Sequence, residues 1–188
     1  MISGDSVKEA QLSFQIGSGG AIPTSPLQFT FVEVTIKEAV IFNQQWHSRL
    51  PELKNSFSCK VAYAAVYQDT TYAVGIWGHP VARSFNHQPI LELRRMAICP
   101  SAPKNTASRM LSVMVKLLKR KYPDLQKVIS YQDTEVHQGT IYKAAGWTIG
   151  RITKAKEIRW GILNSDGTGR KRNPIVTKAD KIRWEKIL

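Results

Sequence analysis

The spacing of hydrophobic and polar residues predicts a chain in which strands and helices alternate. Residues 28–35 alternate in polarity, as a half-buried strand does, and residues 36–46 carry apolar positions at helical spacing. Residues 58–67 and 70–78 are rich in Val, Tyr, Ile and Trp and are separated by only two residues, so they predict an antiparallel hairpin. The first half of the chain therefore predicts a strand, a helix and a hairpin.

A strand over residues 90–98 is followed by the clearest helix of the sequence. Asn105 or Thr106 can cap this helix, and Pro123 stops its propagation. The helix carries an apolar stripe at the helical period, formed by Met110, Met114, Leu117 and Leu118.

A buried strand over residues 127–131 and a short helix over 136–145 come next, and Gly146 is placed to end that helix in a left-handed conformation. The last predicted strands cover residues 146–153 and 156–164, and residues 181–187 are expected to return as an edge strand.

This order of elements predicts an α/β fold, in which a mixed central sheet is flanked by helices. A chain of 188 residues, 43% of them hydrophobic, is long enough to bury one core, so we expect a single domain. Its Gly and Pro content predicts a loosely structured lead-in over residues 1–26, and the domain itself is expected over 27–163. Residues 164–188 are expected to form a basic C-terminal segment that packs on the domain or extends it.

The net charge of +13 changes this picture, because such a surplus on a small domain attracts polyanions. Residues 151–188 contain eleven Lys or Arg and four Asp or Glu, so about half of the surplus lies there. Clustered charge favours a binding surface over evenly spread solubilising residues. The expected partner is a nucleic acid, and the candidate phosphate-binding residues are Arg151, Arg170, Lys171 and Arg172.

Other partners are disfavoured. Cys59 and Cys99 lack a CxxC spacing and a nearby histidine, so we expect buried core thiols and neither a zinc site nor a disulfide-linked partner. The sequence holds no apolar run of membrane-spanning length and no signal peptide, which predicts a cytoplasmic protein without a membrane partner.

The order of elements resembles that of the GNAT acetyltransferases. In those enzymes a loop with the pattern R/Q-x-x-G-x-G/A leads into a helix whose free N–H groups hold the pyrophosphate of acetyl-CoA. Here Asn105 stands where the first glycine is expected, Ala107 fits the last position, and Lys104 can supply the missing positive charge. Asn tolerates left-handed backbone better than most residues. The resemblance implies acetyl-CoA as cofactor, bound by Met96, Ile98, Lys104, Asn105, Thr106, Ala107 and Ser108; a capped helix without a ligand is the alternative.

Residues 141–147 are similar to the tyrosine-bearing helix of GNAT enzymes and the Gly-aromatic pair after it. There the tyrosine hydroxyl can protonate the departing thiolate, which a phenol with a pKa of about 10 can do within hydrogen-bond reach of the sulfur. Tyr142 is therefore a candidate general acid, and the alternative is a packing tyrosine.

Four linked strings together resemble the phage Mom family, at residues 93–98, 102–108, 129–134 and 137–147. Members of this family convert adenine in DNA to a methylcarbamoyl-type derivative at its exocyclic amino group, which shields phage DNA from host restriction. The resemblance implies double-stranded DNA as substrate, the cytoplasm of an infected bacterium as the location, and functional roles for Arg95, Ser108, Asp133 and Tyr142. It extends to His47, although Trp46 can also occupy that place. It also suggests an iron ion with His47, Asp133 and Tyr142 as candidate ligands.

Each of these residues also has a structural interpretation. Asp133 can act as the base for a poorly nucleophilic amine, or can cap the next helix. Arg95 can pair with Glu92, with Asp133 or with a phosphate, and Ser108 can contact cofactor or cap its helix. The tryptophans can stack on bases or pack in the core, namely Trp147, Trp160 and Trp184. An N-acetyltransferase acting on a small-molecule or protein amine is the alternative function.

Overall fold

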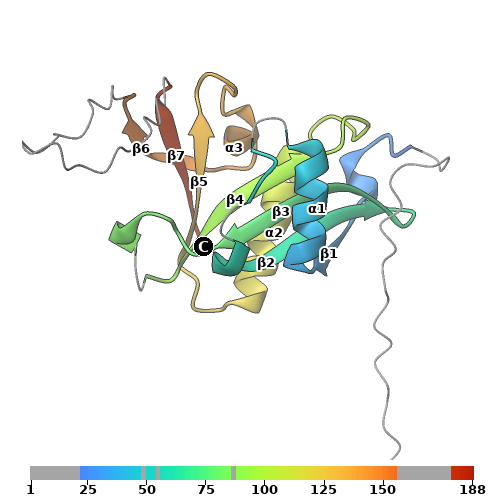
Figure 1. The fold of residues 1–188 in the computed structure, drawn as a ribbon, viewed down its shortest axis with the longest axis horizontal. Coiled ribbons are helices and arrows are strands. Elements are labelled where there is room, and N and C mark those ends of the chain that lie inside the picture. Colours follow the sequence, from blue (N-terminus) through green and yellow to red (C-terminus); the bar gives the residue numbers. More distant parts are fainter. Residues whose placement is uncertain (1–21, 48–49, 54–55, 86–87, 156–178) are drawn as a thin grey trace, which may run out of the picture. The chain divides into compact units, whose positions relative to one another are not determined.

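The computed structural model describes residues 22–47, 50–53, 56–85, 88–155 and 179–188 (Figure 1). They form two compact units, which share strands β3 and β4. One unit holds the chain up to Ile76 together with Arg95–Thr106, and the other holds Trp77–Arg94 together with the chain from Ala107.

The first unit contains β1 (Thr30–Val34), α1 (Ile36–Trp46), β2 (Cys59–Tyr67) and most of β3 (Thr70–Gly78). Thr35 caps α1 through a capping box: its hydroxyl accepts from the Glu38 N–H at 3.2 Å, and the Glu38 carboxylate accepts from the Thr35 N–H at 2.9 Å. The hairpin of β2 and β3 turns at Gln68 and Asp69, whose φ angles of +46° and +62° match the twist of the strands.

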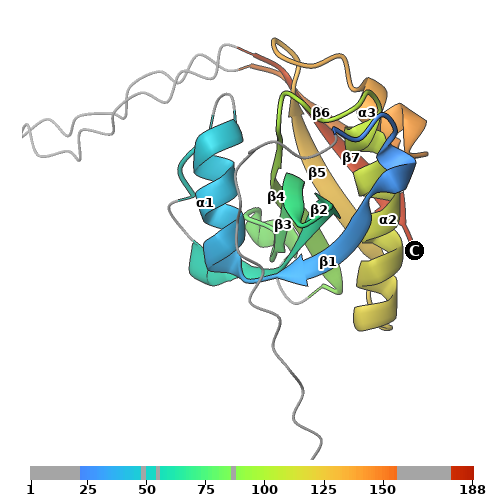
Figure 2. The ribbon, with the colours of Figure 1, turned by 90° about the vertical axis from the view of Figure 1, so that its right-hand side faces the viewer.

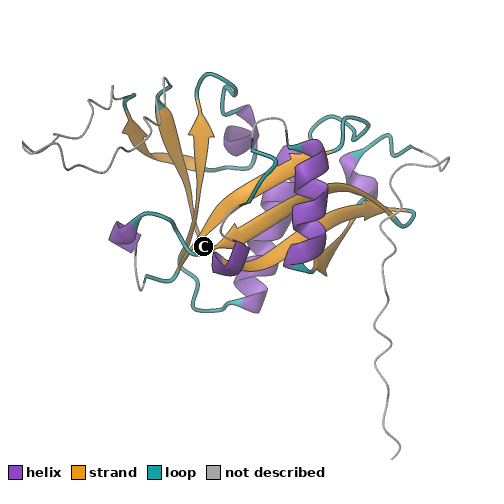
Figure 3. Cartoon of the chain, viewed as in Figure 1, coloured by secondary structure: helices purple, strands orange, loops and turns teal. Residues whose placement is uncertain are grey.

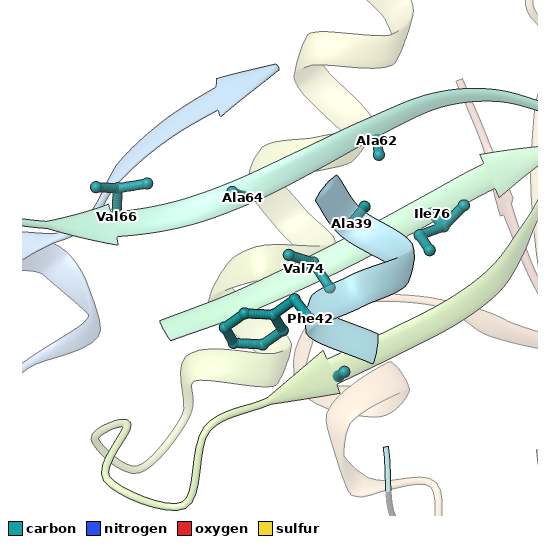
Figure 4. Close-up of a cluster of buried hydrophobic side chains, with 8 residues drawn as sticks. Ala39, Phe42, Ala62, Ala64, Val66, Val74 and Ile76 are labelled. Atoms are coloured by element: carbon teal, nitrogen blue, oxygen red, sulfur yellow. The ribbon is translucent and has the colours of Figure 1, made fainter. Parts of the chain in front are cut away.

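Small side chains let α1 lie close to the strands of this unit. Ala39 and Phe42 of α1 pack against short aliphatic residues of β2 and β3 (Figure 4). The buried cluster comprises Ala39, Phe42, Ala62, Ala64, Val66, Val74, Ile76 and Ala97. Cys59 and Cys99 lie at its margin and are half-buried free thiols, so the expectation that both are fully buried is wrong.

The second unit contains the start of β4 and five further elements. The elements are β4 (Ile90–Ile98), α2 (Thr106–Lys121), β5 (Lys127–Asp133), α3 (Thr140–Ala144), β6 (Thr148–Thr153) and β7 (Lys181–Ile187). Three short 3-10 helices complete the described elements, at Pro26–Gln28, Ser56–Ser58 and Arg83–Phe85. Within the described residues no helix is both long and apolar enough to cross a membrane.

The strands form one seven-stranded mixed sheet in the order β1-β2-β3-β4-β5-β7-β6 (Figures 1 and 3). β4 and β5 are parallel over four residue pairs, from Ile90 with Lys127 to Leu93 with Ser130, and both strands continue past this ladder. β5 and β7 are antiparallel along the whole of β5, and β6 pairs with the other side of β7.

The predicted α/β class with a mixed sheet is confirmed, and the bounds of α1, β3 and β4 are as predicted. The predicted edge position of residues 181–187 is wrong, because β7 lies between β5 and β6. The helix predicted at 136–145 begins only at Thr140, since Asp133 starts a turn and Gly139 is left-handed with φ +73°. The predicted strand at 156–164 lies outside the described residues.

Replacing Gly139 by Ala is expected to cost more stability than the same change at Gly146. Both positions have positive φ, so a side chain strains either one by about 1–3 kcal/mol. A Cβ on Gly139 would also lie 2.6 Å from Gln132 Oε1 and from Trp184 Cζ2, whereas a Cβ on Gly146 meets only the flexible end of Lys186 at 3.2 Å. Chemical denaturation of the two variants measures the difference, and equal losses would contradict the tight contact at Gly139.

Candidate active site

Tyr142 is fixed in a buried aromatic cluster on one face of β5. Its side chain is 7% exposed, and its ring stacks on that of Trp184 with centroids 5.3 Å apart and an interplanar angle of 11°. Trp147 meets the same ring edge-on at 5.7 Å, and it stacks in turn against Trp77 at 6.4 Å. Such contacts hold an aromatic side chain in one orientation. α2 reaches this cluster through Met114, whose sulfur accepts from the Trp77 indole N–H at 3.2 Å.

The Tyr142 hydroxyl lies 2.8 Å from the Ser130 hydroxyl of β5. Burial raises the pKa of Tyr142 above its ordinary value, and the hydrogen bond with Ser130 opposes this rise only in part. Tyr142 therefore carries its proton throughout the physiological pH range, as a proton donor must.

Gln132 and Trp184 connect β5, β7 and the loop before α3. The Trp184 indole donates to the Gln132 side-chain oxygen at 2.6 Å, and the Gln132 amide donates to the His137 carbonyl oxygen. Gly139 has no side chain, and this lets the loop lie directly against Gln132 and Trp184; a Cβ at this position would collide with both. The loop that carries Tyr142 into place is thus held by the last strand of the chain.

Asp133 lies on the opposite face of β5. Side chains alternate along a strand, and the register with β7 is regular through Asp133, which pairs with Lys181. Ser130 and Gln132 lie on the face of Tyr142 and Trp184, so Asp133 faces away from them. The Asp133 carboxylate accepts from the Glu135 N–H at 3.0 Å, which shows that it caps the following turn.

The second unit therefore does not bring Asp133 and Tyr142 together at one point. Tyr142 is buried beside Ser130, and Asp133 belongs to the other face of the strand. No group of three or more His, Cys, Asp or Glu residues gathers in the described parts of the chain. The donor set suggested for iron thus does not fit a shared metal site in this fold.

In the first unit, Arg95 and His47 both bind the backbone of the loop between α1 and β2. Nδ1 of His47 accepts from the Leu50 N–H at 3.1 Å, and the Arg95 guanidinium donates to the Glu52 carbonyl oxygen at 3.3 Å. Buried Asn43 of α1 adds two bonds to the same loop, to the carbonyl oxygens of residues 50 and 51 at 3.1 and 2.8 Å. These side chains shape a loop in addition to any role in chemistry.

Glu92, one of the partners considered for Arg95, forms an ion pair with Arg94 at 3.7 Å. Its carboxylate also accepts from the Val81 N–H at 2.9 Å, and Arg94 donates to the His79 carbonyl oxygen at 3.1 Å. Buried Glu92 thereby anchors the segment that follows β3.

The loop from β4 to α2 enters the helix through a left-handed residue and a closed turn. Asn105 has φ +68°, so it adopts the left-handed conformation that it was expected to tolerate in place of glycine. The Thr106 hydroxyl donates to the Pro103 carbonyl oxygen at 2.7 Å, which closes the turn at the first residue of α2. Lys104 is exposed beside it, and Met96, Ile98, Ala107 and Ser108 are half-buried.

Two of the three tryptophans considered for base stacking belong to the core. Trp147 is 4% exposed and Trp184 2% exposed, while Trp160 lies outside the described residues. Arg151 is exposed on β6, whereas Arg170, Lys171 and Arg172 also lie outside the described residues.

Sequence reasoning missed Ser130, Gln132 and Trp184 as the surroundings of Tyr142. One signal was available: Ser130 and Gln132 are polar residues at alternate positions of a strand whose neighbours are apolar. Buried polar side chains of this kind need partners, and here they bind Tyr142 and Trp184.

Solved structures with a similar fold are acetyltransferases. An acetyltransferase of Bacillus subtilis in complex with CoA matches with a TM-score of 0.56 and 14% identity, over 86% of this chain and 98% of that one. The ribosomal-protein-S18-alanine N-acetyltransferase of Escherichia coli matches with a TM-score of 0.56 and 12% identity, over 85% of this chain and 93% of that one. A GNAT family acetyltransferase of Elizabethkingia anophelis with acetyl-CoA bound matches with a TM-score of 0.54 and 16% identity, over 86% of this chain and 99% of that one. The chain therefore has the GNAT fold, as its order of elements predicted.

The model of the Mom protein family matches residues 28–186. This span covers most of the chain, so the chain belongs to the Mom protein family. A search of curated proteins found no match.

Replacing Ser130 by Ala is expected to destabilise the protein by about 1–3 kcal/mol, because it removes the partner of a buried hydroxyl. The same change should raise the pKa of Tyr142 further, since the hydrogen bond with Ser130 stabilises the phenolate and would be lost. Denaturation and the phenolate absorbance at rising pH measure the two effects, with Tyr142→Phe identifying the signal. In the double variant both hydroxyls are gone, so its cost should be smaller than the sum of the single costs; additive costs would contradict the pairing.

Proposed function

We propose that this protein is a transferase that modifies adenine in DNA at its exocyclic amino group with a methylcarbamoyl-type group. The observation that carries the proposal is the match to the Mom protein family over residues 28–186. The net charge of +13 and the buried hydroxyl of Tyr142, held 2.8 Å from the Ser130 hydroxyl, support it, because they suit a polyanionic substrate and a proton donor.

Acetyl-CoA is the proposed cofactor, and it supplies a two-carbon unit as a thioester when bound. The left-handed Asn105 and the closed turn at Thr106 present the first N–H groups of α2, which suit a pyrophosphate. Exposed Lys104 adds a positive charge at the same place. Met96 and Ile98 of β4, with Ala107 and Ser108 of α2, complete the proposed binding segment.

Tyr142 is the proposed general acid. Its raised pKa keeps the hydroxyl protonated, so Tyr142 would supply a proton to a departing thiolate that lies within hydrogen-bond distance. Ser130 holds the hydroxyl at 2.8 Å, and the stack on Trp184 fixes the ring. This arrangement orients the donor before substrate arrives.

Asp133 is the proposed general base. The exocyclic amine of adenine is delocalised into its ring and is a poor nucleophile, so it needs a carboxylate that takes its proton as the new bond forms. Capping of the turn at Glu135 uses one oxygen of Asp133 and keeps the side chain in place. The methylcarbamoyl group contains a nitrogen that acetyl-CoA does not supply, so the full reaction requires a further nitrogen donor.

Double-stranded DNA is the proposed substrate, and the charge of +13 supports a polyanionic partner. An amine inside a duplex is sterically masked, so the adenine must leave the stack to reach the protein. Protection of phage DNA in the cytoplasm of an infected bacterium is the corresponding biological role.

Expression of the protein in a bacterium should produce a modified adenine, detected by mass spectrometry after digestion of total DNA to nucleosides. Asp133→Asn and Tyr142→Phe should each lower the yield by about a hundredfold or more, because each removes a proton-transfer group. Asn can still accept from the Glu135 N–H, and Phe can still stack on Trp184, so both variants should fold normally.

Matched controls are Asp124→Asn, at an exposed aspartate after α2, and Tyr122→Phe, which should both leave the yield unchanged. Unmodified adenine together with acetylation of a small-molecule or protein amine would overturn the proposal in favour of an ordinary N-acetyltransferase. Full activity of Asp133→Asn would instead mean that Asp133 only caps its turn.

A further inference from the structure

One face of the strands β5, β7 and β6 presents Asp133 within a grid of cationic and aromatic side chains. The register places Asp133, Lys181 and Thr153 in one row across the three strands. The next row is formed by Tyr131, Arg183 and Arg151. Side chains directly opposite each other in neighbouring strands point to the same face, so these two rows share the face of Asp133.

A bulge in β6 brings Arg151 to this face. Thr148 pairs with Glu185 and Ile149 with Trp184, but the next pair joins Arg151 to Arg183, which leaves Gly150 as an extra residue. Without this bulge, regular alternation would place Arg151 on the same face as Ile149 and Trp184. A side chain at Gly150 would collide with the Glu185 carboxylate, so glycine suits this position.

The cations of this face differ in their partners. Arg183 binds the Glu185 carboxylate at 2.7 Å, lies 4.9 Å from the ring centre of Phe85, and shares Glu185 with Lys127. These partners hold the pKa of Glu185 below its usual value although burial acts against them. Arg151 and Lys181 are exposed and form no ion pair within the described part of the chain.

Arg151 stands directly opposite Arg183, an arrangement of like charges that lowers the stability of a sheet. A bound anion would relieve that repulsion. Tyr131 in the same row is 39% exposed, and its ring offers a surface on which a base can stack. Two exposed cations and an aromatic ring beside a carboxylate suit a nucleic acid strand better than an acidic protein, which carries no base to stack.

We propose that the face formed by Tyr131, Arg151, Lys181 and Arg183 binds the phosphate backbone of DNA next to the adenine that is modified. The choice of this occupant rests on the proposed function. Arg151 and Lys181 contact phosphates, Tyr131 stacks on a base near the target, and Asp133 in the adjoining row lies beside the amine. The surface that grips the substrate and the proposed base thus belong to one sheet face.

The test is the salt dependence of binding to a fluorescently labelled DNA duplex that contains adenine. The variant Arg151→Ala/Lys181→Ala should reduce the slope of log Kd against log salt concentration by about two, since each lost phosphate contact lowers it by roughly one. A matched control is Lys116→Ala/Arg120→Ala, which removes the same charge from exposed positions of α2. α2 lies near α3 (Figure 2), and its Met114 contacts Trp77 of the aromatic cluster around Tyr142, which is on the face of β5 away from Asp133. This control should therefore leave the slope nearly unchanged.

Thermal unfolding separates binding from folding. Removal of Arg151 should leave the melting temperature unchanged or raise it, because the repulsion with Arg183 disappears. Equal slope changes in the two double variants would overturn the proposal, since only net charge would then matter. Equally tight binding of the wild type to polyglutamate would also overturn it.

The adenine assay keeps this inference distinct from the proposed function. If the wild type leaves adenine unmodified but Arg151→Ala/Lys181→Ala lowers the slope, the proposed function fails and the DNA-binding face stands. If the wild type modifies adenine and the variant keeps its full slope, the proposed function stands and the binding face is refuted.

Discussion

The antiparallel pairing of β7 with β5 is the constraint on which the second unit depends. Through this pairing Trp184 reaches the face of β5 that carries Ser130 and Gln132, where it stacks on Tyr142 and donates to Gln132. α3 is only five residues long, and a helix that short has little stability of its own. The position of Tyr142 is therefore imposed by the last strand of the chain and by Gly139, which lets the loop approach Trp184 closely.

Strand alternation then separates two kinds of chemistry. On the Tyr142 face of β5, aromatic rings bury the Tyr142 hydroxyl away from water, and this burial raises the pKa of Tyr142. The face with Asp133 is open at Tyr131, and it carries cations on β7 and β6. The two side chains proposed for proton transfer thus lie in different environments: a buried hydroxyl, and a half-buried carboxylate that caps a turn.

Local patterns predicted much of this fold. The apolar spacing gave α1, β3 and β4 their bounds, and Asn105 was correctly expected to tolerate a left-handed backbone. Long-range pairing was not predictable in the same way, because nothing in residues 181–187 states which strands they join; β7 lies inside the sheet and not at its edge. The late start of α3 escaped the pattern because the Asp133 turn competes with helix formation. The separation of Asp133 from Tyr142 likewise follows only from the register.

Arg95 and His47 show how a residue can matter to a site through the backbone it holds. Both bind the loop after α1, at Glu52 and Leu50, and buried Asn43 binds the same loop. Substitution of side chains that fix a loop in this way can slow a reaction strongly, since small displacements of a positioning segment misalign the reacting groups. The resemblance that singled out these two residues is therefore compatible with positioning roles, whereas Tyr142 and Asp133 carry the hydroxyl and the carboxylate that we propose for proton transfer.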